Sequence, residues 1–405
     1  MQFFKDLSLS AFTAGFVAVL VGFTSSVAIV FQAAKAFGAT PAQISSWMWA
    51  LGIGMGICTV VPSLLLRQPV MVAWSTPGAA VLATAGLASM SGPEGDAGAF
   101  TMGHAVGAFM VSAALTVLVG VTGWFEKIMN RIPPALAAAL LAGVLGRFGL
   151  QAFTAAQTAL PLVLVMLGSY LLARRFTPRY AVVVTLVIAI IFIASRAEFT
   201  WATTPFGLNS IATPIFTAPV FSIASITSLA IPLFVVTMAS QNLPGVAAIR
   251  AAGYDMPISK IITLTGVATL VLAPFGAFAL NLSAITAAIC MGREAHPDTS
   301  RRYTAAVTCG LIYLVIGIFG SAVTGVLTAF PKELIVAIAG LALLGTIGSG
   351  LAAAMQDESH REAALITFLV TLSGVVIAGI GSAFWGVVAG AVALLVQNYR
   401  RVPPR

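Results

Sequence analysis

RQPVMVAWSTPGAAVLATAGLA, residues 67–88, is an apolar stretch that carries a helix break in its own middle. The apolar run starts after Pro69 and is interrupted at residues 75–78, where Pro77 lacks an N–H and Gly78 lowers helix propensity. We therefore predict that a half-helix starts near Pro77. At membrane depth the free N–H groups of such a start form a site for a polar or anionic group. The alternative is a proline-kinked helix packed on its neighbours.

The composition indicates a protein that crosses a membrane many times. Hydrophobic residues make up 59% of the chain and charged residues only 8%, and apolar runs long enough to span a bilayer recur to the C-terminus. The net charge of +8 is scattered over short loops without an aromatic-rich polar face, which argues against nucleic acid as a partner. We therefore predict an all-α polytopic protein embedded in the lipid bilayer.

The apolar segments number about fourteen. They lie near residues 11–34, 43–66, 70–89, 101–122, 134–150, 157–174, 179–195, 223–241, 258–273, 275–291, 303–328, 333–351, 362–378 and 380–397. An even number of spans puts both termini on one side. If that side is the cytoplasm, it holds every Lys and Arg except Lys35, Arg147, Arg196 and Lys332, as the positive-inside rule favours.

Three pairs of segments resemble each other in the same order. They are residues 24–40 with 239–255, residues 75–79 with 280–284 when Pro69 is aligned with Pro274, and residues 132–145 with 330–343. Together they indicate two halves of about seven spans, and because seven is odd the second half is inverted. We predict a first repeat at 1–195, an external connecting loop at 196–222 and a second repeat at 223–405. Inverted repeats with matching interrupted helices are typical of secondary transporters.

Three stretches resemble the bacterial benzoate:proton symporter family and, more distantly, the uracil/nucleobase and sulfate-transporter superfamily. They are PVMVAWSTPGAAVLA at 69–83, MASQNLPGVAAIRAAGY at 238–254 and APFGAFALNLSAITAAICMG at 273–292. The resemblance implies an inner-membrane protein with seven-plus-seven inverted repeats, interrupted third and tenth spans, and a core domain that moves against a gate domain. Nucleobase transporters place acids in the eighth and tenth spans, whereas the matching positions here are Gln241, Asn242 and Asn281.

The candidate substrate site follows from the two interruptions. Two half-helix N-termini, near Pro77 and near residues 282–283, would direct partial positive charge at one carboxylate. Polar donors and flanking rings complete the set, which consists of Thr24, Ser25, Ser26, Trp74, Ser75, Thr76, Gly78, Gln241, Asn242, Phe278, Asn281 and Ser283. For the hydroxyls the alternative is interhelical packing, and for Trp74 and Phe278 it is core or lipid packing.

Other residues give no sign of enzyme chemistry. The three cysteines lack disulfide or metal spacing, and no Walker A, H-E-x-x-H or G-x-S-x-G pattern occurs. We predict no cofactor, no metal and no enzymatic activity. His104 is the only histidine near an apolar segment, where a structural hydrogen bond is the alternative to a role in proton coupling. The glycines of residues 51–58 are expected to allow close helix packing.

The predicted function is import of benzoate or a similar aromatic carboxylate with a proton. The alternatives are a transporter for another organic anion or a nucleobase, an anion channel on the same fold, and a membrane-embedded enzyme. Whether the chain works as a homodimer stays open at this point.

Overall fold

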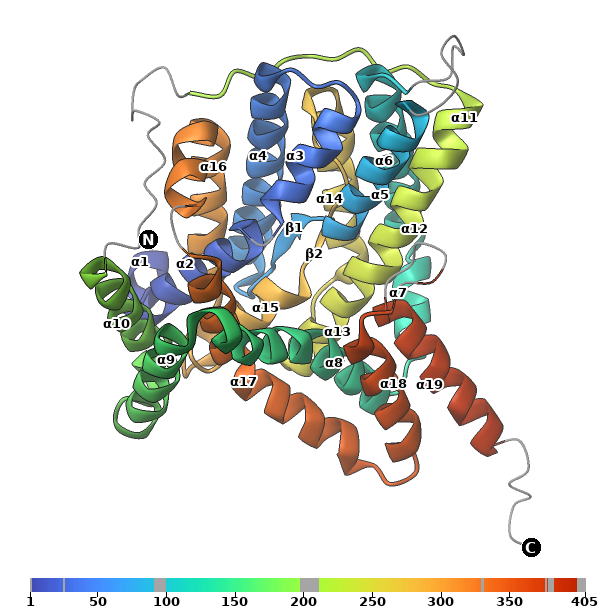
Figure 1. The fold of residues 1–405 in the computed structure, drawn as a ribbon. Helices are drawn as coiled ribbons and strands as arrows, with labels where there is room; N and C mark the ends of the chain where they lie inside the picture. Colours follow the sequence, from blue (N-terminus) through green and yellow to red (C-terminus); the bar gives the residue numbers. More distant parts are fainter. Residues whose placement is uncertain are drawn as a thin grey trace, which may run out of the picture.

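The structure is a computed structural model that describes residues 2–24, 26–90, 100–196, 211–328, 331–375, 377 and 382–398. It is almost entirely helical, as predicted, apart from two three-residue strands near its centre (Figure 1). The first half of the chain forms α1 (Gln2–Asp6), α2 (Leu9–Thr24), α3 (Val27–Ala36), α4 (Pro41–Leu66), β1 (Val72–Trp74), α5 (Thr76–Met90), α6 (Met102–Thr122), α7 (Trp124–Met129), α8 (Pro134–Thr154), α9 (Ala156–Phe176), η1 (Pro178–Tyr180) and α10 (Ala181–Ser195).

The second half begins with a span that is interrupted by two π-helical turns. It forms α11 (Ile223–Ser225), η3 (Ile226–Ala230), α12 (Ile231–Thr237), η4 (Met238–Asn242), α13 (Leu243–Ala251), α14 (Ile258–Leu272), η5 (Ala273–Phe275), β2 (Leu280–Leu282), α15 (Ala284–Met291), η6 (Thr299–Arg301), α16 (Tyr303–Thr328), α17 (Lys332–Gln356), α18 (Arg361–Ser373) and α19 (Ser382–Asn398). The segments η3 and η4 are π-helical, a geometry that often marks functional positions.

Eight helical stretches of the described chain are long and apolar enough to cross a membrane. They are α4, α6, α8, α9, α17 and the stretches Ile223–Ala251, Ile258–Phe275 and Thr299–Gly320. Three shorter apolar helices, α2, α10 and α19, fall in further predicted segments. The other three predicted segments are α18 and the two broken ones, β1–α5 and β2–α15. The predicted segments are therefore all helical in part, but fewer than fourteen are full-length helices.

Glycines bring two helix pairs together in the upper half of Figure 1. Gly52 of α4 faces Gly317 of α16, and a Cβ added to Gly52 would lie 2.6 Å from the Gly317 backbone. Gly120 of α6 faces Thr263 of α14 in the same way, and a Cβ added to Gly120 would lie 2.5 Å from the Thr263 hydroxyl. The predicted packing role of the glycines in residues 51–58 is confirmed, since only glycine allows this helix approach.

A second group of helices lies in the lower half of Figure 1. Helix α8 packs against α17 and α18, α9 packs against α10 and α17, and α18 packs against α19. Helices α8 and α17 begin in the same way, because Pro133 (φ −56°, ψ 140°) and Pro331 (φ −55°, ψ 139°) are their N-caps. Helices α13 and α15 of the upper group meet α8 and so join the two groups.

Two predicted boundaries differ from the structure. The span expected at 11–34 is two helices, α2 and α3, because Ser26 is not helical (φ −137°). The span expected to end at residue 241 continues to Ala251, because η4 widens the helix without ending it.

Residues 211–222, part of the predicted connecting loop, lie in extended form across the ends of four helical segments. The Ile215 N–H donates to the Ser46 hydroxyl at 2.8 Å, and the Ala212 N–H donates to the Ile318 carbonyl at 2.9 Å. The Thr217 and Val220 N–H groups bind the carbonyls of Pro274 and Gly103. This part of the connection therefore binds α4, α16, η5 and α6 together.

Candidate functional site

The two broken spans meet in a short antiparallel ribbon. β1 pairs with β2 so that Val72 lies opposite Leu282, Ala73 opposite Asn281 and Trp74 opposite Leu280. Helix α5 leaves one end of the ribbon and α15 leaves the other (Figure 1). The predicted half-helix start near Pro77 is confirmed at Thr76, and the one near residues 282–283 is confirmed at Ala284.

The predicted alignment of the two breaks is wrong by three residues. Both strands and both helix starts show that Ala73, not Thr76, is the counterpart of Asn281, and that Ser75 corresponds to Ser283. Pro274, which the predicted alignment pairs with Pro69, sits in the turn η5 after α14. Gly276 follows that turn with φ +105° and lengthens the path into β2.

The two half-helix starts differ in how their N–H groups are used. At α5, the Ser75 hydroxyl accepts from the Gly78 N–H at 3.0 Å, and Pro77 has no N–H to offer. The expected set of free donors is therefore smaller there. At α15, the N-cap residue Ser283 makes no side-chain cap hydrogen bond. The first turn of α15 is consequently the better placed of the two to bind an added acceptor.

Asn281 is fully buried in the middle of the ribbon and has one unmet polar atom. Its Nδ2 donates to the Ala279 carbonyl at 2.9 Å, whereas its Oδ1 has no hydrogen-bond partner among the described residues. The hydroxyls of Thr286, in the first turn of α15, and Thr237, at the end of α12, are also buried with no partner in the described chain. Buried polar atoms are normally paired, so each of these suits an absent ligand or water.

Sequence reasoning missed Thr237 and Thr286. Thr286 lies three residues after Ser283, and Thr237 lies one turn before Gln241, so both adjoin predicted positions. The π-helical turn η4, which is not readable from the sequence, separates Thr237 from Asn242.

Asn242 supports the ribbon from the eighth predicted span. Its Oδ1 accepts from the Leu282 N–H at 2.9 Å, and its Nδ2 donates to the Met238 sulfur at 3.1 Å. Both ends of this fully buried amide are thus engaged within the fold. Gln241, its neighbour in η4, is half-buried.

The aromatic candidates are packed against other rings. Trp74 lies 5.5 Å from Phe23, centroid to centroid, and its Nε1 donates to the Ser26 hydroxyl at 2.9 Å. Phe278 is fully buried with its ring centroid 5.8 Å from those of both Trp47 and Phe109. These contacts favour the core-packing interpretation for Phe278. The Thr24 side chain and Ser25 lie outside the described residues.

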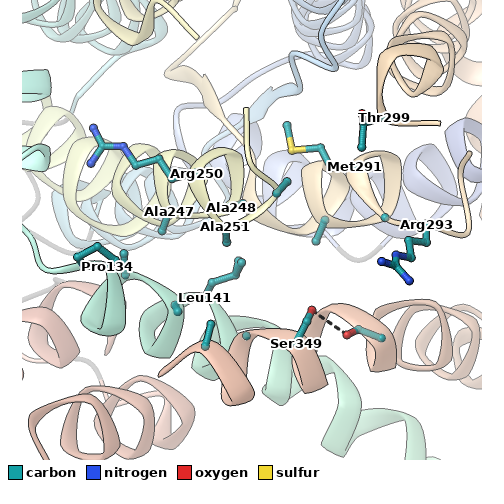
Figure 2. A pocket seen from close by; sticks show the side chains of 18 of the residues that line it. Pro134, Leu141, Ala247, Ala248, Arg250, Ala251, Met291, Arg293, Thr299 and Ser349 are labelled. Atoms are coloured by element: carbon teal, nitrogen blue, oxygen red, sulfur yellow. Dashed lines mark hydrogen bonds between the residues drawn. The ribbon is translucent and has the colours of Figure 1, made fainter. Parts of the chain in front are cut away.

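The described cavity of about 1130 Å³ lies away from the ribbon. Figure 2 shows it between α13 and α15 on one side and α8 and α17 on the other. It reaches α13 at Ala247 and α15 at Ala288, and none of the predicted site residues lines it. Thr76, which is half-buried, and Asn281 both belong to the predicted substrate site, and neither lines this cavity. Four arginines and one glutamate line it, namely Arg174, Arg250, Arg293, Arg302 and Glu294.

The described residues contain no group of three or more His, Cys, Asp or Glu side chains suited to a metal ion. His104 is in a capping box at the start of α6, where its Nδ1 accepts from the Thr101 N–H at 3.2 Å. This is the structural hydrogen bond that the sequence left as the alternative to proton coupling.

Comparison with known proteins finds one family over nearly the whole chain. The family described as benzoate membrane transport protein matches residues 5–396. The chain is 48% identical over 385 residues to the inner membrane protein YdcO of Escherichia coli (strain K12), covering 95% of each chain. It is 39% identical over 393 residues to the benzoate membrane transport protein of Acinetobacter baylyi, covering 97% of this chain and 96% of that one. Among solved structures, the transmembrane domain of a cyanobacterium bicarbonate transporter, BicA, has a TM-score of 0.47 at 15% identity and 98% coverage of both chains.

Proposed function

This chain belongs to the benzoate membrane transport protein family, and we propose that it is a secondary active transporter that imports benzoate or a similar aromatic carboxylate with a proton. The observation that carries the proposal is the β1–β2 ribbon, from whose two ends the half-helices run in opposite directions. Interrupted spans at matching positions are where secondary transporters bind substrate.

Paired local geometry supports the proposed seven-plus-seven inverted repeat. Gly38 after α3 and Gly253 after α13 were aligned from the sequence, and they have φ of +74° and +81°. Each lies in the same helix ending, with Ala39 N–H bound to Ala34 and Tyr254 N–H bound to Ile249. Helix contacts are also paired between the halves. The second predicted span of each half packs against the fourth span of the other half, as α4 does with α16 and α14 does with α6.

The middle of the ribbon suits an anion. The N-terminal ends of α5 and α15 face it from opposite directions, with Ser75 and Ser283 about four strand residues apart, or roughly 13 Å. Both helix ends contribute partial positive charge. Ala73, opposite Asn281, is small and half-buried, which leaves room beside the ribbon. Residues 70–90, 226–251 and 277–291 contain no Asp or Glu to repel a carboxylate.

Within the proposed site the residues have different tasks. We assign Asn281, Gln241, Thr76, Gly78, Ser283 and the span-one hydroxyls of Thr24, Ser25 and Ser26 to ligand contact, and Trp74 to one wall for an aromatic ring. Ser75, Asn242 and Phe278 hold the half-helix start, the ribbon and the aromatic core around it. In this proposal, no carboxylate within residues 70–90, 226–251 or 277–291 carries the coupled proton, because these ranges contain no Asp or Glu.

Three features of the whole protein are proposed with this function. Both termini face the cytoplasm, the upper helix group acts as the core domain and the lower group as the gate domain. The protein assembles as a homodimer, which cross-linking in native membranes would test.

The test is uptake of labelled benzoate by purified protein in liposomes. A secondary transporter shows saturable counterflow when unlabelled benzoate is trapped inside, and an inward pH gradient drives accumulation that a protonophore abolishes. Uptake without counterflow indicates a channel, and counterflow with uracil or sulfate but not benzoate overturns the substrate assignment. Liposomes with Asn281→Leu protein at matched reconstitution serve as the control.

A further inference from the structure

The cavity between α13, α15, α8 and α17 carries a charge that the proposed site does not use. Arg174, Arg250, Arg293 and Arg302 line it with Glu294 as the single acidic side chain. Clefts lined by one sign of charge concentrate the opposite ion. The first question is which of these arginines is available to a ligand.

Three of the four arginines are engaged in holding the fold. Arg250 donates to the Met129 carbonyl at 2.7 Å and to Asn130. Arg302 is nearly fully buried and donates to the His296 carbonyl at 2.7 Å and the Met291 carbonyl at 2.6 Å. Arg174 donates to the Tyr170 hydroxyl at 2.6 Å and lies 3.6 Å from Glu294.

Arg293 differs from these three. It is exposed, and within the described chain no hydrogen bond or ion pair is found for its guanidinium. It follows Gly292, the C-cap of α15, and Figure 2 shows its side chain reaching from the end of α15 toward α17 and Ser349. A structural role at the C-terminus of α15 is already filled, because Arg302 binds the Met291 carbonyl there.

Part of the cavity lining is apolar and built of small side chains. Ala247, Ala248 and Ala251 of α13 face Leu141 of α8 across the cavity (Figure 2). Ala288 of α15 also lines it. A guanidinium binds a carboxylate with two parallel N–H···O bonds, and small apolar side chains leave flat space for a ring. The cavity volume of about 1130 Å³ exceeds what one small aromatic acid fills.

We propose that Arg293 provides, within this cavity and outside the ribbon, a second binding subsite for a small aromatic carboxylate. Its preference for anions follows from the charges alone, whereas benzoate as the natural occupant rests on the proposed function. The subsite lies just after the C-terminal end of α15, whose N-terminal end follows the ribbon strand β2.

Charge-selective labelling of a cysteine in the cavity tests this directly. The parent cysteines Cys58, Cys290 and Cys309 are buried, so Ser349→Cys, or Ala353→Cys if the first variant folds poorly, supplies a reactive thiol. The probes are methanethiosulfonates that carry a sulfonate or a quaternary ammonium. We expect the ratio of the anionic to the cationic labelling rate to be several-fold higher for this cysteine than for a free thiol in solution.

The matched variants give outcomes that support or overturn the subsite. Arg293→Gln should lower the anionic-to-cationic rate ratio several-fold, whereas Arg131→Gln, which removes the same charge outside the cavity lining, should leave it within about two-fold. Benzoate should slow labelling with Arg293 present and not in Arg293→Gln, and Arg293→Lys should keep the rate ratio but lose part of the protection. An unchanged ratio and unchanged protection in Arg293→Gln overturn the proposal. Absence of benzoate counterflow would refute the proposed function instead, and the rate ratio would still decide for or against an anion subsite.

Discussion

Asn281 is the residue at which sequence and geometry agree most closely on a ligand. It is a fully buried amide at the centre of the ribbon, and its Oδ1 lacks a partner among the described residues while its Nδ2 is bound to Ala279. An amide can rotate to donate to a carboxylate at the cost of one internal hydrogen bond. A carboxylate at the same position would repel the anion.

Replacing Asn281 with Leu removes that donor. We expect benzoate binding to weaken by roughly 1–3 kcal/mol, which is about 5- to 150-fold in Kd, because a buried polar partner of the ligand is left unmet. Isothermal calorimetry in detergent measures the change. Thr286→Val, which removes a hydroxyl that has no partner in the described chain, should weaken binding with little change in Tm. Unchanged affinity in a folded Asn281→Leu protein would exclude the residue from the site.

Gln241 tests whether the ligand is an anion at this place. In Gln241→Glu a negative charge replaces a half-buried amide in η4, so benzoate binding should be lost at pH 7.5. Binding should return as pH falls far enough to protonate the new carboxyl, which removes its charge. Binding titrations across pH measure this, and Gln151→Glu, an exposed position on α8, is the control. Parent-like affinity at pH 7.5 with the group ionised would place Gln241 away from the carboxylate.

At the scale of elements, the breaks were predictable and their pairing was not. Pro77 and the polar residues Asn281 and Ser283 interrupt apolar runs, so the helix breaks can be predicted without knowing the packing. Gly38 and Gly253 were aligned with each other from the sequence and both have positive φ, but the helix that ends before Gly253 was predicted to end at residue 241. The ribbon register, the π-helical turns and the break at Ser26 depend on contacts between distant segments, so the sequence alone misplaced Asn281 by three residues against its counterpart.

The turn that leads into β2 requires glycine at residue 276. Its φ of +105° is in the region that favours glycine, and an added Cβ would lie 1.9 Å from Trp47 Cδ1. Gly276→Ala should therefore disturb both the turn into β2 and the Trp47–Phe278 contact. We expect a Tm loss of several degrees and weaker benzoate binding. Gly168→Ala in α9, where an added Cβ meets no atom within 4 Å, should not lower Tm. Equal Tm values for the two variants would show that the turn tolerates a side chain.

At the scale of the molecule, the two helix groups meet where the cavity lies. Helices α13 and α15 form one wall of the cavity, and α8 and α17 form the other. The N-cap prolines of α8 and α17 have nearly the same backbone angles. A rigid-body movement of one group against the other would close this cavity without changing the pairs within each group. The cavity was not predictable from the sequence, because it is the space between helices that are far apart in the chain.

The proposed orientation places this cavity on the cytoplasmic side and residues 211–222 on the external side. Thr213 is exposed in that external segment, and Ala353 is exposed in the cavity lining. In Thr213→Cys and Ala353→Cys variants, whose parent cysteines are buried, a membrane-impermeant maleimide should label the first in intact cells and the second only after permeabilisation. This result requires an odd number of crossings between the two positions, since opposite sides of a bilayer are reached only that way. The predicted spans eight to twelve lie between Thr213 and Ala353 and give five crossings, which is an odd number. Labelling of both variants from the same side would contradict the orientation and the inverted relation of the two halves.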